Sequence, residues 1–129
     1  MRSKAREGVF KYLFSKLFNP GDEGLFDVLI KELGDDDKNF AKELLNAALN
    51  GESKYTEAID NLSERFSERR IFAADKCALI IGMAELDNFP NTPTAVAVDE
   101  AVKLAVTYST ERSADFVNGI LAEYAKDRK

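Results

Sequence analysis

The sequence of 129 residues predicts an all-α protein that forms a single domain of about seven helices. Apolar residues recur three and four positions apart along almost the whole chain, and no alternating strand pattern stands out. Turn-forming segments rich in Gly, Pro or Asn separate these stretches. Residues 77–84 contain no polar side chain, which is typical of a buried central helix. We therefore expect two packed helical sub-bundles that meet around this helix.

Four helices are expected in the first half of the chain. The first covers residues 3–18, where apolar side chains form one stripe, and the Asn-Pro-Gly turn that follows ends it because proline cannot continue a helix. A second helix covers residues 22–33. A third begins after the acidic residues 35–37, which suit the cap and first turn of a helix, and Asn50-Gly51 ends it. A fourth spans residues 53–66.

Three more helices are expected in the second half. The fifth covers residues 68–86 and includes the apolar run at 77–84. A buried strand is the alternative for that run, but its helical flanks favour a helix. A proline-bounded connection follows, in which Pro93 suits the first turn of the next helix and Thr92 suits its cap. The sixth and seventh helices are expected over residues 93–108 and 111–125.

The charge of the chain is distributed unevenly. The formal net charge is −5, yet residues 1–16 carry five basic side chains and a single acidic one. Such a basic end can meet phosphates locally even on an acidic body, because salt screens the repulsion over about 8 Å. The alternative is a solvated N-terminal helix with no ligand. The absence of a long apolar segment, a secretory signal or a cysteine pair predicts a cytoplasmic protein.

The sequence shows no arrangement of residues that would support catalysis. It contains no histidine, and its one cysteine, Cys77, lies in the apolar run, where a buried thiol is expected. The acidic residues 35–37 resemble the start of a calcium loop, but Phe40 and Asn46 stand where such a loop needs glycine and glutamate. No glycine-rich phosphate loop is present. We therefore expect a binding protein without cofactor or metal, and not an enzyme.

The second half of the chain carries a specific combination of motifs. These are IGMAEL at residues 81–86, VAVDEAV at 96–102 and FVNGIL at 116–121. With the basic opening at residues 2–7, this combination resembles the NusB family. The Asn-Phe-Pro segment at 88–90 and the Tyr-Ser-Thr segment after the sixth helix are similar to the variant of some Bacteroidetes-type members.

The resemblance implies a function in transcription antitermination. NusB proteins are all-helical and have two sub-bundles. They bind the boxA element of nascent RNA, notably in rRNA operon leaders, together with NusE, a protein of the small ribosomal subunit. The complex joins other Nus factors on RNA polymerase, and no cofactor takes part. Some members form homodimers that cover the RNA-binding surface.

The resemblance also implies site residues. The expected RNA-binding residues are Arg2, Lys4, Arg6, Lys11, Phe14 and Phe116. The basic side chains would meet phosphates, although Lys11 lies off the face that Arg2 and Arg6 share, and each phenylalanine either stacks on a base or belongs to the core. The expected contacts with NusE lie at the start of the fifth helix, where the pattern predicts exposed side chains, at Arg69, Arg70, Asp75 and Lys76.

Two departures from the family pattern leave an alternative function open. Besides Ile80, which stands in a region where members carry an arginine, the basic N-terminal segment is short and the rest of the chain is strongly acidic. Both departures predict weak affinity for RNA alone and a greater dependence on a protein partner. The alternative is a NusB-fold module that binds proteins without significant affinity for RNA. The same fold also targets some RNA methyltransferases to RNA, but this chain has no cofactor loop of its own.

Overall fold

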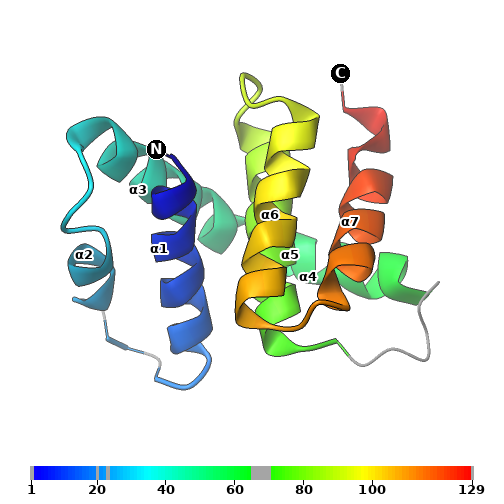
Figure 1. Ribbon diagram of the computed structural model, residues 1–129, viewed down its shortest axis with the longest axis horizontal. Helices are drawn as coiled ribbons and strands as arrows, with labels where there is room; N and C mark the ends of the chain where they lie inside the picture. Colours follow the sequence, from blue (N-terminus) through cyan, green and yellow to red (C-terminus); the bar gives the residue numbers. More distant parts are fainter. Residues whose placement is uncertain (1, 20, 23, 65–70, 129) are drawn as a thin grey trace.

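A computed structural model describes residues 2–19, 21–22, 24–64 and 71–128 (Figure 1). The described residues contain no strand, which confirms the predicted all-α class. They form α1 (Arg2–Lys16), α2 (Leu25–Leu29), α3 (Asp35–Asn50), α4 (Glu52–Ser63), α5 (Ala73–Asn88), α6 (Thr94–Tyr108), α7 (Ser113–Tyr124) and the 3-10 helix η2 (Ala125–Asp127). None of these helices is long and apolar enough to cross a membrane.

The helices form two groups that share α5. Helices α1, α2 and α3 pack together on one side, and α4, α6 and α7 surround α5 on the other (Figure 1). Helix α5 contacts α1 and α3 of the first group as well, and every residue from Cys77 to Leu86 is buried. This arrangement confirms the expected pair of sub-bundles around a buried central helix. It follows from the apolar run, because a helix without a polar face must be covered on all sides.

Two glycines allow close packing between helices. A Cβ atom on Gly82 of α5 would lie 2.7 Å from Cδ1 of Leu121 and 3.1 Å from Cβ of Ala101, so α6 and α7 approach this point closely. A Cβ atom on Gly8 of α1 would lie 3.1 Å from Cγ2 of Ile30, which follows α2. Glycine therefore fixes how near α5 lies to the C-terminal pair.

Three helix boundaries differ clearly from the prediction. Helix α5 begins at Ala73 and not at residue 68, since Ile71 and Phe72 are not helical, and residues 68–70 lie outside the described residues. Helix α2 has five residues where the pattern predicts about twelve, and it is anchored mainly by Phe26 and Ile30, both buried. Helix α6 begins at Thr94, with Pro93 in the cap position, and Thr92 supplies no side-chain cap. Thr92 instead closes a turn, in which its backbone N–H donates to the carbonyl of Phe89 at 3.0 Å.

Candidate nucleic-acid and protein interface

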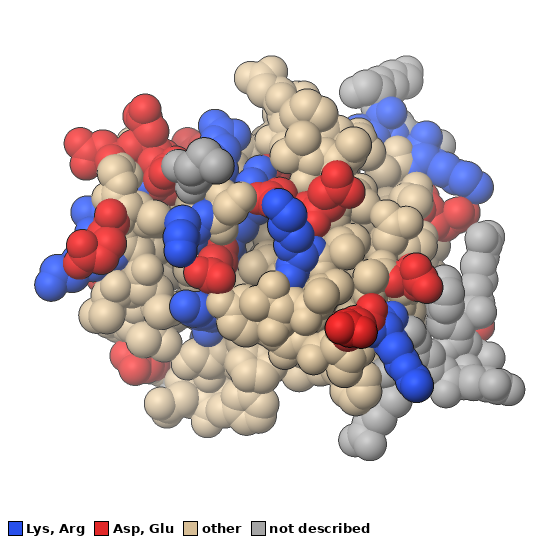
Figure 2. Space-filling model, viewed as in Figure 1, with Lys and Arg blue, Asp and Glu red and all other residues tan. Residues whose placement is uncertain are grey.

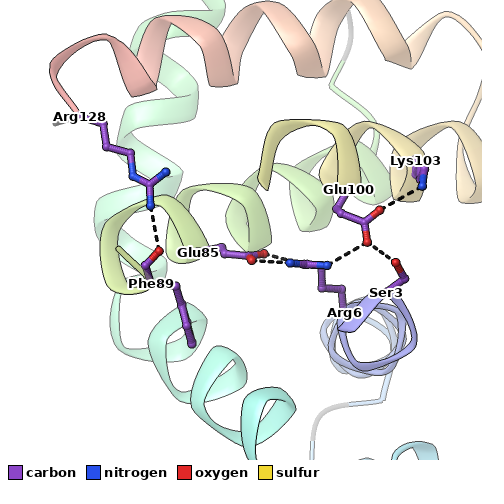
Figure 3. A network of polar contacts seen from close by, with 7 residues as sticks. All are labelled: Ser3, Arg6, Glu85, Phe89, Glu100, Lys103 and Arg128. Carbon is purple, nitrogen blue, oxygen red and sulfur yellow. Dashed lines mark hydrogen bonds and ion pairs between the residues drawn. The ribbon is translucent and has the colours of Figure 1, made fainter. Parts of the chain in front are cut away.

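Arg6 lies at the junction of the two sub-bundles and is 5% exposed. Its Nε and Nη2 donate to the two carboxylate oxygens of Glu85 on α5, at 2.7 and 2.6 Å. Its Nη1 donates to Oε1 of Glu100 on α6, at 2.9 Å. Figure 3 shows the guanidinium between these two carboxylates. One arginine of the first sub-bundle thus joins two helices of the second.

Glu100 is the outer member of this network. It also accepts a hydrogen bond from the Ser3 hydroxyl and forms an ion pair with Lys103 at 3.2 Å (Figure 3). Burial raises the pKa of Glu100, but the hydrogen bonds from Ser3 and Lys103 and the charge of Arg6 outweigh it and hold the pKa below its usual value. Burial likewise lowers the pKa of Arg6, and Glu85 and Glu100 more than compensate. Arg6 and Glu100 are therefore both charged at neutral pH.

This network changes the role that the sequence suggested for Arg6. A phosphate ligand needs an exposed cation, whereas the guanidinium of Arg6 is buried and already bound by two carboxylates. Arg6 is therefore a structural residue in this protein. The sequence holds one sign of this role, because Arg6 stands three, four and seven positions before Val9, Phe10 and Leu13 on the buried stripe of α1.

Arg2 and Lys4, in contrast, are exposed on the first turn of α1. The guanidinium carbon of Arg2 lies 4.3 Å from the centroid of the Phe40 ring, a cation–π contact that orients the side chain. The N-terminus of a helix adds a partial positive charge to these cations. Lys11 is exposed too, farther along α1, with its Nζ 3.9 Å from a carboxylate oxygen of Glu7. Arg2 and Lys4 thus make one end of α1 suitable for an anion.

The two phenylalanines proposed for base stacking differ in exposure. Phe116 on α7 is 1% exposed and belongs to the core, so a base cannot reach its ring. Phe14 on α1 is half-buried and stacks on Phe10, with ring centroids 6.0 Å apart. Its other neighbour is Phe18, 5.2 Å away, which is 70% exposed. Of the two rings, only Phe14 remains at the surface.

These aromatic residues belong to an apolar area at the C-terminal end of α1. We call Phe14, Leu17, Phe18 and Tyr108 the aromatic surface. The ring of Tyr108 at the end of α6 stacks on Phe10, with centroids 4.8 Å apart, and continues the row from Phe18 through Phe14. Leu17 is 52% exposed. In Figure 2 the lower central part of the molecule, where α1 and α6 end, is mostly free of charged side chains. Exposed apolar side chains that lie together make this surface a candidate contact for another protein.

The residues expected to contact NusE differ in how exposed they are, and two of them lie outside the described residues. Asp75 is completely buried in the first turn of α5, and its two carboxylate oxygens have no hydrogen-bond partner among the described residues. The prediction that Asp75 is exposed is therefore wrong. Lys76, its neighbour, is half-buried. Arg69 and Arg70 lie outside the described residues.

Comparison with known proteins identifies the family. The NusB family pattern matches residues 3–126. The chain is 34% identical to the transcription antitermination protein NusB of Methylacidiphilum infernorum, over 98% of this chain and 91% of that protein. It is 35% identical to the protein of the same name from Salinibacter ruber, over 93% of this chain and 78% of that one.

Solved structures agree with this assignment. A T. maritima NusB structure superposes with a TM-score of 0.89 at 28% identity, covering 99% of this chain and 92% of that one. A crystal structure of the antitermination factors NusB and NusE in complex with dsRNA shares the fold, with a TM-score of 0.82 at 24% identity over 97% of this chain and 96% of that one. The all-α fold, the sequence pattern and the relatives together show that this chain belongs to the NusB family.

Proposed function

We propose that this protein is a transcription antitermination factor that binds boxA-type single-stranded RNA together with NusE and so promotes transcription of rRNA operons. The observation that carries the proposal is the family match over nearly the whole chain, residues 3–126. The names of the relatives and the NusB–NusE–RNA complex with the same fold support it. Contacts with other Nus factors and RNA polymerase would be indirect, and the protein would act in the cytoplasm.

Binding, and not catalysis, is the mechanism that we propose. The described residues contain no group of three or more side chains that could hold a metal ion. Burial raises the pKa of Cys77 to about 12, so this thiol stays protonated and is a poor nucleophile at neutral pH. Recruitment by surface contacts needs neither group.

The two ends of α1 would serve the two ligands. Arg2 and Lys4 at its N-terminus are the proposed phosphate contacts, and Lys11 extends this set along the helix. Each neutralised phosphate of a single strand adds about −0.7 to the slope of log K against log salt, so Arg2 and Lys4 together account for about −1.4. A slope this small implies weak binding to RNA alone, which a protein partner must strengthen.

We propose the aromatic surface as the contact for NusE. Its exposed apolar side chains lie where α1 and α6 end, beside the start of α5 (Figure 1). Lys76, in the first turn of α5, is the proposed polar contact with the same partner. Burial of the Phe18 ring in a complex would contribute about 1.5–3 kcal/mol. Phe18→Ala should therefore weaken NusE binding about tenfold or more. Val96→Ala is the matched control, since Val96 is exposed on α6 but lies at the start of that helix.

The test of the RNA contact is fluorescence anisotropy with a labelled boxA-type RNA. The RNA is titrated at two salt concentrations, with and without NusE. Arg2→Ala and Lys4→Ala should each weaken binding and reduce the salt slope by about 0.7. Lys31→Ala, which removes an exposed cation near α2, should change neither quantity.

The alternative function makes a different prediction in the same titration. A NusB-fold module that binds only proteins would form a stable complex with NusE and leave the anisotropy of the RNA unchanged. That result would contradict the proposed RNA-binding role and keep the family assignment. Binding that is insensitive to salt would instead contradict the roles given to Arg2 and Lys4.

A further inference from the structure

A pocket of about 590 Å³ lies between the C-terminal half of α3 and the loop that joins α5 to α6. Arg2 and Glu43 lie at its wall on the side of the first sub-bundle, and three asparagines, Asn50, Asn88 and Asn91, take part in its lining. Its volume falls within the range of about 300–1,000 Å³ that small-molecule sites occupy. The pocket therefore has room for one planar group such as a nucleobase.

The asparagines of the pocket offer unused hydrogen-bonding groups. Neither Asn50 nor Asn91 makes a side-chain hydrogen bond to any described residue. Asn88 donates through Nδ2 to the Tyr55 hydroxyl at 3.3 Å and to the Ala84 carbonyl at 2.9 Å, which leaves its Oδ1 as an acceptor. The carboxamides of Asn50 and Asn91 present donors and an acceptor in one plane, and Asn88 adds an acceptor. The edge of a nucleobase needs this combination.

A buried hydroxyl in the same loop also lacks a partner. Thr92 contributes to the pocket lining and is 4% exposed, and its Oγ1 has no hydrogen bond within the described part of the chain. Nearly all buried polar groups in proteins are paired, so an unpaired one needs an explanation. Because this oxygen is itself covered, the Thr92 side chain must rotate before its hydroxyl can bond to a ligand in the pocket.

The charges around the pocket favour one orientation of a nucleotide. Arg2 is held against Phe40, and the Phe40 ring meets the Phe89 ring edge-on, with centroids 5.0 Å apart. A phosphate would lie beside Arg2, while the carboxylate of Glu43 repels it and suits an exocyclic amino group instead. The polar lining gives an apolar side chain of a protein partner little to bind.

The loop is already held in place before any ligand binds. Arg128, which follows η2, donates through Nη2 to the Phe89 carbonyl at 2.8 Å and through Nη1 to the Thr94 hydroxyl at 2.9 Å. Figure 3 shows Arg128 reaching the backbone at Phe89. A site whose loop is fixed in advance loses less conformational entropy on binding.

We propose that this pocket receives one unpaired base of the bound RNA, with Arg2 on the adjoining phosphate. The proposal rests on the proposed RNA-binding function and assigns the pocket to it. The base would stand among Asn50, Asn88 and Asn91, which would read its edge. The C-terminal sub-bundle thus takes part in RNA recognition through its loop, although the proposed basic contacts lie on α1.

The test combines protein variants with abasic RNA. A labelled boxA-type RNA is prepared with an abasic site at each position in turn, and each RNA is titrated with the wild-type protein and with Asn50→Ala/Asn91→Ala. The control variant is Asn46→Ala, which removes an exposed asparagine of α3 that is not part of the pocket lining. Urea unfolding of all variants checks that they remain folded.

The expected result is a coupling between the pocket and one RNA position. The double variant should bind the intact RNA about tenfold more weakly, with an unchanged salt slope because no charge is removed. At one position the abasic site should weaken binding by the wild type and by Asn46→Ala, but not by the double variant.

Other outcomes overturn the proposal in separable ways. If the intact RNA binds and no abasic position depends on the asparagines, the pocket is not a base site and the proposed function stands. A loss of NusE binding in the double variant, with RNA binding unchanged, would assign the pocket to the protein partner instead. If the wild type binds no RNA with or without NusE, the proposed RNA-binding function fails together with the pocket.

Discussion

Arg6→Ala removes the cation that joins α1 to α5 and α6. In the variant the carboxylate of Glu85 remains in a position where its side chain is 1% exposed, without the ion pair at 2.6 Å. Loss of one partner from a buried pair costs about 3–5 kcal/mol, because the remaining charge is neither hydrated nor neutralised. Glu100 suffers less, since Ser3 and Lys103 still bind it.

This loss is large compared with the stability of the whole domain. Proteins of this size unfold with a free energy of about 5–15 kcal/mol, so Arg6→Ala would remove about a fifth of it or more. The expected fall in melting temperature is about 10–20 °C. Urea unfolding followed by circular dichroism measures the change, with Lys4→Ala as the control, since substitution of this exposed cation should change stability by less than about 0.5 kcal/mol.

A double variant separates the buried charge from the lost packing. Arg6→Met/Glu85→Leu replaces the pair by apolar side chains of similar size, and such replacements are often nearly neutral. We expect it to be clearly more stable than Arg6→Ala. If Arg6→Ala unfolds at the same urea concentration as the wild type and instead loses affinity for RNA, the structural role of Arg6 is refuted. Arg6 would then be a phosphate contact, as the family resemblance suggested.

Three further predictions concern packing, acid stability and the thiol. Gly82→Ala should lose about 1–3 kcal/mol, because its Cβ meets Leu121 at 2.7 Å, whereas Gly24→Ala, with open space around it, should be nearly neutral in the same urea titration. The lowered pKa of Glu100 gives stability that is fully present above its ordinary value of about 4.5 and is lost as the pH falls through the folded value. Between pH 7 and pH 3 the melting temperature of Glu100→Gln should therefore fall less steeply than that of the wild type. Since burial raises the pKa of Cys77 to about 12, a thiol reagent at pH 8 should react with it only after unfolding, and rapid reaction of the native protein would contradict its burial.

Most of the fold could be predicted from the sequence because local patterns of apolar and turn-forming residues indicate where the helices lie. The unbroken apolar run of α5 identifies the central helix, and the proline-bounded connection marks the start of α6 within a residue or two. The length of α2 could not be predicted. Only Phe26 in the helix and Ile30 directly after it are buried in this segment, so few contacts fix where the helix ends. How many residues a short helix includes depends on contacts that periodicity does not show.

The site could be predicted only in part, for a related reason. Arginine is usually a surface residue, so the sequence gives little reason to expect Arg6 to be buried. Its partners stand 79 and 94 positions farther along the chain, and local sequence patterns cannot show that the fold brings them together. Phe116 and Phe18 are the same residue type at helical spacing, yet one is buried and the other exposed. Exposure is decided by which helices cover each position, and the exposed ring of Phe18 lies beyond the end of α1.

Helix α1 therefore has two separate tasks, and this separation affects how variants must be interpreted. Its buried stripe, with Arg6, holds the sub-bundles together, while Arg2, Lys4 and the aromatic surface are its exposed groups. The pocket is lined from both sub-bundles, so its shape depends on the contact that Arg6 makes. A variant of Arg6 would thus lose RNA binding through a displaced pocket, although the buried guanidinium contacts no phosphate. This loss must be distinguished from that of a true phosphate contact such as Arg2. Only the comparison of urea midpoint with salt slope distinguishes the two, because displacement lowers the midpoint, whereas loss of a phosphate contact lowers the slope.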